Sequence, residues 1–244
     1  MRLIFRPWTN TFARVSLVIG LSAPLVIILG LMLYVRAPAF TQAMQEVVQP
    51  VQFDHRHHVA DVGIDCRYCH QSVEKAASAG YPPTQLCLNC HSQVWNKSPL
   101  LDIVRKSYFG NDPIPWKRVH RLPDFAYFNH SIHVNKGVGC ESCHGRVDEM
   151  PAVEENGGLV TQASGFTPLT MGWCLECHRN PEKYIRPKDQ VITMGYKADK
   201  DPGAQAMLDT FHKQHPDQAG ATLGEALIHE NAVRTRVSCT ACHR

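Results

Sequence analysis

The chain has almost no net charge beyond its amino end. Its first 36 residues hold four arginines and no acidic residue. The other 208 residues hold 21 basic and 22 acidic side chains, which leaves a net charge of −1. A domain that binds nucleic acid through electrostatics carries a strong positive excess. The composition therefore excludes nucleic acid as a partner of this kind.

Charge is also missing from a long apolar run near the amino end. Val15 to Val35 is 21 residues without a charged side chain, which is long enough to cross a bilayer as a helix. Pro24 lies in mid-run, where it can kink a spanning helix without preventing it. We expect a transmembrane anchor over residues 15–35, followed by a linker over residues 36–52.

The basic residues around this run predict its orientation. Arg2, Arg6 and Arg14 precede the run, whereas only Arg36 follows it closely. Because basic residues stay on the cytoplasmic side, we expect a single-pass protein of the bacterial inner (cytoplasmic) membrane. Residues 1–14 would lie in the cytoplasm and everything after Arg36 in the periplasm. A cleaved signal peptide is the alternative, but the apolar core of such a peptide is usually shorter.

No cysteine is left over for a structural disulfide. All ten belong to five copies of Cys-x-x-Cys-His, in the pairs Cys66 and Cys69, Cys87 and Cys90, Cys140 and Cys143, Cys174 and Cys177, and Cys239 and Cys242. The histidines that complete these motifs are His70, His91, His144, His178 and His243. Cys-x-x-Cys-His is the attachment signature of a c-type haem.

The spacing suits haem for a physical reason. Cysteines three apart lie on one face of a helical turn, so both can bond to the vinyl groups of one porphyrin edge. The next histidine then reaches the iron as its proximal ligand. Zinc sites usually pair two Cys-x-x-Cys units and give no role to a histidine after each of them. The sequence therefore predicts five covalently bound haem c groups and a protein that moves electrons.

Five haems leave little room for a side-chain core. Beyond Arg36, roughly 42 residues would serve each haem, and the porphyrins would form much of the buried apolar surface. We expect a multihaem cytochrome c fold of mainly short α-helices and loops, with few strands. Pro82-Pro83 and Gly157-Gly158 interrupt the chain in the way such a fold requires.

An internal repeat organises this region. Two lead segments, each followed by two haem motifs, are Phe53-x-His55-x-x-His58 and Phe128-x-His130-x-x-His133. Seven residues separate the first lead from Cys66, and six separate the second from Cys140. We expect a first dihaem unit over residues 53–127, a second over 128–180, and a segment with the fifth haem over 181–244.

Nine further histidines are candidates for the distal ligand on the other side of each iron. Histidines three apart share a helical face, so one histidine of a lead can bind a haem of its own unit and the other a neighbouring haem. We expect the distal ligands to be His55, His58, His120, His130 and His133. The other four, His57, His212, His215 and His229, we expect at the surface. Methionine is the other common ligand, and the residues alone leave open whether Met150 or Met171 binds iron or only fills space.

These patterns carry a family resemblance. A lead of this form ahead of Cys-x-x-Cys-His resembles the small multihaem cytochromes of the c3/c7 class. The single span, the five motifs and three stretches are more specific, namely Pro115–Val134, Cys143–Val153 and Leu169–Arg179. Together they are similar to the pentahaem cytochrome c subunit of alternative complex III, a bacterial quinol:electron-acceptor oxidoreductase. The similarity runs from about Phe53 to Arg179 and is weaker towards Arg244.

The resemblance implies a role in a respiratory or photosynthetic membrane complex. The chain would be a periplasmic haem wire beside an iron–sulfur subunit, polytopic quinol-binding subunits and a monohaem cytochrome c. It would pass electrons from quinol oxidation towards a cytochrome, a cupredoxin or a terminal oxidase. Two alternatives stay open at this point. One is a tethered quinol dehydrogenase that feeds a periplasmic reductase, and the other is a multihaem reductase with an open iron.

Overall fold

The computed structural model describes residues 6–41, 47–51, 53–149, 153–155, 158–160 and 169–243. The chain divides into two compact units, Met1–Gln45 and Glu46–Arg244. The division follows the composition, because the first unit contains the long apolar run and the second contains every Cys-x-x-Cys-His motif.

The first unit is built on one long helix. Helix α1 (Trp8–Tyr34) has 27 residues and no buried side chain, and α2 (Pro38–Thr41) follows it. Within the described part of the chain, α1 is the single helix long and apolar enough to cross a membrane. It begins seven residues before the predicted span, because a helical backbone tolerates the polar residues that a bilayer core excludes.

The second unit consists of short helices, as the composition predicted. Its α-helices are α3 (Cys66–Cys69), α4 (Thr84–His91), α5 (Asp102–Gly110), α6 (His130–Asn135), α7 (Glu141–His144), α8 (Met171–Arg179), α9 (Pro202–Gln214), α10 (Leu223–Glu230) and α11 (Cys239–Cys242). A π-helix, η1 (Arg56–Asp61), precedes α3. Single 3₁₀ turns are η2 (Pro99–Leu101), η3 (Val147–Glu149), η4 (Pro181–Lys183), η5 (Lys188–Gln190), η6 (Ala198–Lys200) and η7 (Pro216–Gln218).

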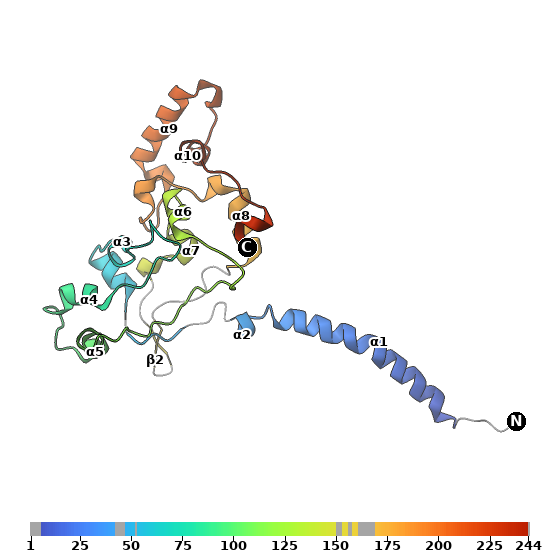
Figure 1. Ribbon diagram of the computed structural model, residues 1–244. Helices are drawn as coiled ribbons and strands as arrows, with labels where there is room; N and C mark the ends of the chain where they lie inside the picture. Colours follow the sequence, from blue (N-terminus) through green and yellow to red (C-terminus); the bar gives the residue numbers. More distant parts are fainter. Residues whose placement is uncertain are drawn as a thin grey trace. The chain divides into compact units, whose positions relative to one another are not determined.

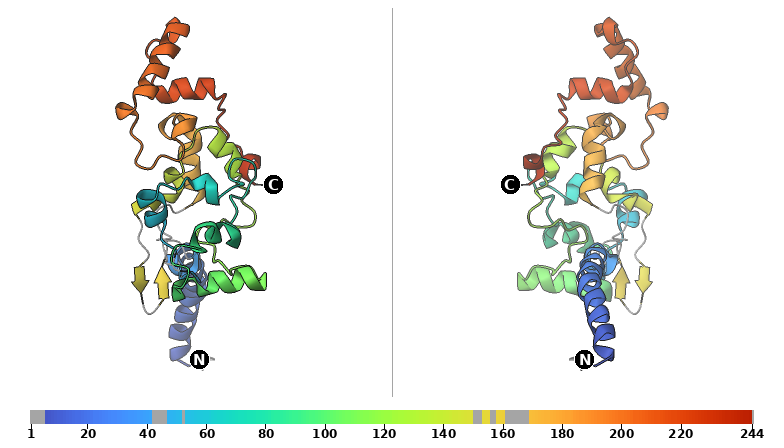
Figure 2. Two further views of the ribbon diagram at one scale, coloured as in Figure 1. Left: turned by 90° about the vertical axis from the view of Figure 1, so that its left-hand side faces the viewer. Right: turned by 90° about the vertical axis from the view of Figure 1, so that its right-hand side faces the viewer.

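Strands play a small part in the described residues. Strand β1 (Val153–Glu155) pairs with β2 (Gly158–Val160) in antiparallel register, with Val153 opposite Val160. Within the second unit, α4 and α5 lie at one end and α9 and α10 at the other, with α3, α6, α7 and α8 between them (Figure 1, Figure 2). The expected helical fold with few strands is therefore confirmed for these residues.

The side-chain core of the second unit is small, and its cluster around α5 also contacts Cys87 and Leu88 of the second motif. One cluster joins Val51 to Leu101, Val104 and Ile114 around α5. A second centre forms where α9 packs on α10, with Phe211 1% exposed. In contrast, the five helices that carry the motifs hold no fully buried residue. Such a distribution is expected where porphyrins supply the buried apolar surface.

Candidate haem centres

Each of the five motifs forms a short helical turn. Side-chain caps help to start two of these turns, since Asp65 accepts a hydrogen bond from the Arg67 amide and Thr170 accepts one from the Trp173 amide. The turn brings the two cysteines of a motif to one face. None of the ten cysteines forms a disulfide, and none is fully buried. This arrangement leaves each pair available to a porphyrin edge.

Hydrogen bonds between described residues orient the histidines of four motifs. The Nδ1 atom of each lies within hydrogen-bonding distance of a backbone carbonyl oxygen, in the pairs His70 to Gly80 at 2.9 Å, His91 to Val94 at 3.1 Å, His178 to Arg236 at 2.9 Å and His243 to Phe125 at 2.9 Å. Because a carbonyl can only accept, Nδ1 must carry the proton. The Nε2 lone pair is then free for a metal, which is the usual arrangement of a metal-binding histidine.

The two lead segments have the same local geometry. His58 Nδ1 donates to the carbonyl of Asp54, and His133 Nδ1 donates to that of Asn129, both at 2.7 Å. The ring of Phe53 lies 4.3 Å from that of His58 at 24°. In the second lead, Phe128 and His133 repeat this at 4.4 Å and 24°. The sequence repeat is therefore also a structural repeat.

One residue of difference between the repeats is absorbed by a π-helix. The first lead stands seven residues before its motif and the second stands six before its own. In the second, the Val138 amide donates to the carbonyl of His133, whereas in the first the Ile64 amide reaches that of His58. The wider turns of η1 take up the extra residue. Both leads can thereby present their histidines in the same way.

The second histidine of each lead faces the second motif of its own unit. The rings of His58 and His91 are 6.2 Å apart at 63°, and those of His133 and His178 are 6.1 Å apart at 64°. Two imidazoles on opposite sides of one iron, with metal–nitrogen bonds of about 2 Å, have ring centres about 6 to 6.5 Å apart. The spacing of both pairs fits a bis-histidine haem.

The first histidines of the leads gather around the first and third motifs. The rings of His130 and His144 are 6.3 Å apart and nearly parallel, at 6°. Burial lowers the pKa of His55 to about 4, with further contributions from His70 and His58, and Asp54 acts in the opposite direction. Burial likewise lowers the pKa of His144 to about 3, with His120 as the largest further cause. These rings are neutral at physiological pH, as iron ligands must be.

His120 carries a buried polar atom that a bound metal could satisfy. Its Nε2 atom is buried and has no hydrogen-bond partner. Its ring lies 4.7 Å from that of His144 at 88°. A buried polar atom without a partner costs free energy, and a metal bond would remove that cost. The donor set of the described residues therefore fits haem iron.

The two dihaem units of the repeat meet through their first motifs. The thiols of Cys66 and Cys140 are neighbours, and each shifts the pKa of the other, so that the pKa of Cys66 is lowered and that of Cys140 is raised. The start of α6 is fixed to the chain after the first motif, because both the amide and Nδ1 of His130 donate to the carbonyl of Ala77, at 3.1 and 2.8 Å. In the same manner, η1 packs against η3, which follows the third motif. The lead segment of each dihaem unit therefore contacts the stretch that follows the first motif of the other dihaem unit.

The remaining histidines are placed less uniformly than we expected. His57 and His229 are exposed, as predicted. His212 and His215 are half-buried instead, because Phe211 anchors α9 against α10 and draws its neighbours in. His212 Nε2 lies 2.9 Å from the carbonyl of Ala221, so that nitrogen must donate and is not free for a metal.

The two methionine candidates have different outcomes. Met171 begins α8 and is 68% exposed, so its sulfur is not held against a buried partner. Met150 lies outside the described residues.

An ion pair next to the third motif had no signal in the sequence. Arg186 is 8% exposed and donates to Glu141, which stands between Cys140 and Cys143. Its partner is 45 residues away in the chain, so no local pattern indicated it.

Comparisons with known proteins identify multihaem cytochromes c as relatives of this chain. The model of the cytochrome c552 family matches residues 115–238. The menaquinone reductase multihaem cytochrome c subunit of Nitratidesulfovibrio vulgaris strain Hildenborough is 31% identical over 148 residues, which cover 54% of this chain and 68% of that protein. A cytochrome c-552 of Porphyromonas gingivalis strain W83 is 25% identical over 125 residues, covering 41% of this chain and 24% of that protein. The chain thus spans about a quarter of the second relative's length.

Proposed function

Because this chain belongs to the cytochrome c552 family, in which haem c is bound covalently, we propose that it is a pentahaem cytochrome that relays electrons from quinol oxidation. All five motifs would hold a haem through their cysteine pairs and bind its iron through the following histidine. Bound haem supplies one-electron redox chemistry at the iron. The relative from N. vulgaris is a subunit of a menaquinone reductase, which supports a quinol-linked role.

The facing histidine pairs are the observation on which the proposal rests. His58 with His91, and His133 with His178, have the spacing of two ligands on one iron. An iron with two protein ligands has no open position for a substrate, so it suits electron transfer rather than the reduction of a bound molecule. This favours an electron-transfer subunit over a multihaem reductase.

We infer the membrane position of the chain from its first unit and its partner proteins from the resemblance to alternative complex III. We propose that α1 anchors it in the bacterial inner membrane with its amino end in the cytoplasm and the haem unit in the periplasm. The sequence stretches shared with alternative complex III support that complex as the assembly. Its partners would be an iron–sulfur subunit, polytopic quinol-binding subunits and a monohaem cytochrome c, with a cytochrome, cupredoxin or oxidase downstream.

A tethered quinol dehydrogenase is the second candidate. It is favoured by helix α1, which is the single candidate membrane span among the described residues and could tether the haem unit. In that case the chain would contact quinol itself, with α1 as the tether, and would deliver electrons to a periplasmic reductase.

One purification separates the two candidates. The full chain carries a carboxyl-terminal tag and is isolated from membranes in a mild detergent, and the co-purifying polypeptides are identified by mass spectrometry. Haem per chain is counted from the pyridine haemochrome spectrum, and a menaquinol is then added. Five haems, iron–sulfur and polytopic partners, and haem reduction by quinol are the expected result. A lone chain that quinol still reduces would favour the tethered dehydrogenase. A lone chain that quinol does not reduce would overturn the proposal.

A further inference from the structure

We propose that the five haems form one unbranched chain in the order second, first, third, fourth, fifth, so that electrons enter and leave at the second and fifth haems. The inference rests on the proposed function in one respect, namely that all five motifs carry haem. The order differs from that of the motifs in the sequence, because the second motif lies outside the first.

The first link joins the second and first motifs. The Asn89 side chain, within the second motif on α4, donates to the Tyr68 hydroxyl, within the first motif on α3, at 3.0 Å. The lead segment η1 joins the same two centres, since His58 faces His91, and His70 is, after burial, the largest cause of the lowered pKa of His55. Burial and the nearby Cys87 raise the pKa of the Cys69 thiol, as is expected if the two motifs adjoin.

The second link joins the first and third motifs, across the two repeat units. The amide and Nδ1 of His130, ahead of the third motif, donate to the carbonyl of Ala77, which follows the first motif, and the thiols of Cys66 and Cys140 are neighbours. The contacts of α6 with Ala77 and of η1 with η3 hold the two dihaem units with their first motifs side by side.

The third and fourth motifs are linked through one short helix. His130 faces His144 of the third motif, and His133, three residues later on α6, faces His178 of the fourth. Burial raises the pKa of the Cys143 thiol to about 12, and Cys177 and Cys174 of the fourth motif contribute to it. The two haems would therefore share α6, as the second and first share η1.

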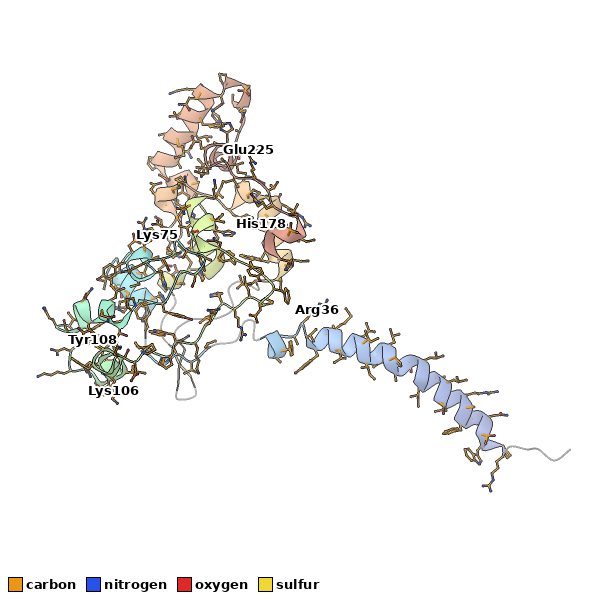
Figure 3. All side chains as sticks on the ribbon, in the orientation of Figure 1. Arg36, Lys75, Lys106, Tyr108, His178 and Glu225 are labelled. Atoms are coloured by element: carbon orange, nitrogen blue, oxygen red, sulfur yellow. The ribbon has the colours of Figure 1, made fainter. Side chains whose placement is uncertain are left out.

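The last link joins the fourth and fifth motifs. His178 Nδ1 donates to the carbonyl of Arg236, three residues before Cys239. Cys242 raises the pKa of Cys174, after the larger effect of burial. Figure 3 shows His178 on α8, next to the red C-terminal helix α11. In Figure 1 the motif helices follow one another as α4, α3, α7, α8 and α11.

The exposure of the cysteines gives independent support. Eight of the ten are partly buried, and the two exposed ones are Cys90 of the second motif and Cys239 of the fifth. An interior haem has neighbours on two sides, whereas a terminal haem keeps one side for solvent or a partner. At the second motif, Trp95 is 62% exposed and its ring lies 6.5 Å from that of His91. The second and fifth haems, at the two ends of the proposed haem order, would therefore also be the most accessible.

The direct test is an experimental structure of the haem-loaded full chain, with the irons located by anomalous scattering. The expected result is that the irons of motifs two and one, one and three, three and four, and four and five are nearest neighbours, and that the second and fifth irons are farthest apart. Five irons in any other order would overturn the inference and leave the proposed function standing. Fewer than five irons would overturn the haem count itself, and this order with it.

A pair of matched variants tests the same order in solution. Cys66→Ala with Cys69→Ala removes the first haem, and Cys87→Ala with Cys90→Ala removes the second. We consider an electron donor that reduces the fifth haem. The variant without the first haem should then also lose fast reduction of the second haem, because the second haem is cut off from the other three. The other variant should keep fast reduction of all four remaining haems. The reverse pattern, in which loss of the second haem isolates the first, would contradict the order.

Discussion

Arg186 donates a hydrogen bond from Nη2 to Oε1 of Glu141 at 2.7 Å, in an ion pair whose side chains are 9% and 15% exposed. A second donation runs from Nη1 to the carbonyl of Thr193 at 2.9 Å, and the guanidinium carbon lies 5.1 Å from the ring centre of Tyr196. Glu141 belongs to the turn between the cysteines of the third motif. The pair therefore ties the segment after η4 to the centre of the proposed haem chain.

Removal of Arg186 should strongly destabilise the second unit. Arg186→Met leaves the largely buried Glu141 carboxylate without its ion-pair partner, and loss of one partner of a buried pair typically costs about 3 to 5 kcal/mol. We expect a clear fall in the unfolding midpoint of the haem-loaded chain, followed by circular dichroism. Arg56→Met is the matched control, because Arg56 pairs with Asp54 at the surface and is 51% exposed. Loss of such a pair changes stability by about 1 kcal/mol or less. Equal effects of the two variants would contradict the role of Arg186.

A glycine next to this ion pair should tolerate no side chain. Gly137 has φ +90°, and a Cβ there would lie 2.5 Å from the carbonyl oxygen of Arg186. Gly137→Ala should therefore destabilise by more than about 1 kcal/mol, through backbone strain and steric conflict. Gly220→Ala is the control, since it meets no atom within 4 Å. Urea unfolding of both variants decides the matter, and an unchanged midpoint for Gly137→Ala would be the contrary result.

Two adjacent histidines should behave in opposite ways when replaced. His58→Ala should convert the second haem from low-spin to high-spin, because its ring faces His91 at the ligand distance, while covalent attachment persists. His57→Ala should leave every haem unchanged, since His57 is exposed and pairs with Asp61. Electron paramagnetic resonance spectra of the oxidised chains provide the measurement. Identical spectra for the two variants would rule out His58 as a ligand.

His133→Ala should repeat the effect of His58→Ala at the fourth haem. The geometry of the two leads agrees within 0.1 Å and 1° in the pairing with the motif histidine. A low-spin fourth haem in His133→Ala, together with a high-spin second haem in His58→Ala, would show that the repeats differ in function despite their shared geometry.

The fifth haem should differ from the other four in its sixth ligand. The five expected distal histidines lie around the first four motifs, with His55, His120 and His130 beside the first and third. Among the described residues, the ring found beside His243 is that of Phe125, at 5.8 Å. We therefore expect four bis-histidine signals and one distinct haem in magnetic circular dichroism spectra. Five equivalent bis-histidine haems, with all ligands from this chain, would contradict this assignment.

Local chemistry explains how much could be predicted from the sequence. Attachment of haem needs two cysteines and a histidine within one helical turn, so every candidate attachment site was visible as a motif. The repeated leads predicted four distal candidates for the same reason, and the structure gives them matching geometry. The burial of His212 and His215 was not predicted, because it depends on Phe211 in the packing of α9 on α10. Arg186 was missed because its partner is remote in the chain.

The sequence alone determined which residues are candidates to bind haem and which segment is apolar enough to span a bilayer. Covalent attachment, ligand type and the capacity to span a bilayer depend on residues close together in the chain, and short-range patterns report them. The order of the motifs, the pairing of His58 with His91 and the contact of Cys66 with Cys140 were decided by the tertiary structure. These depend on how η1 and α6 pack against segments far away in sequence. Only folding brings such groups close together, and the distances between the haem sites decide which haems can exchange electrons.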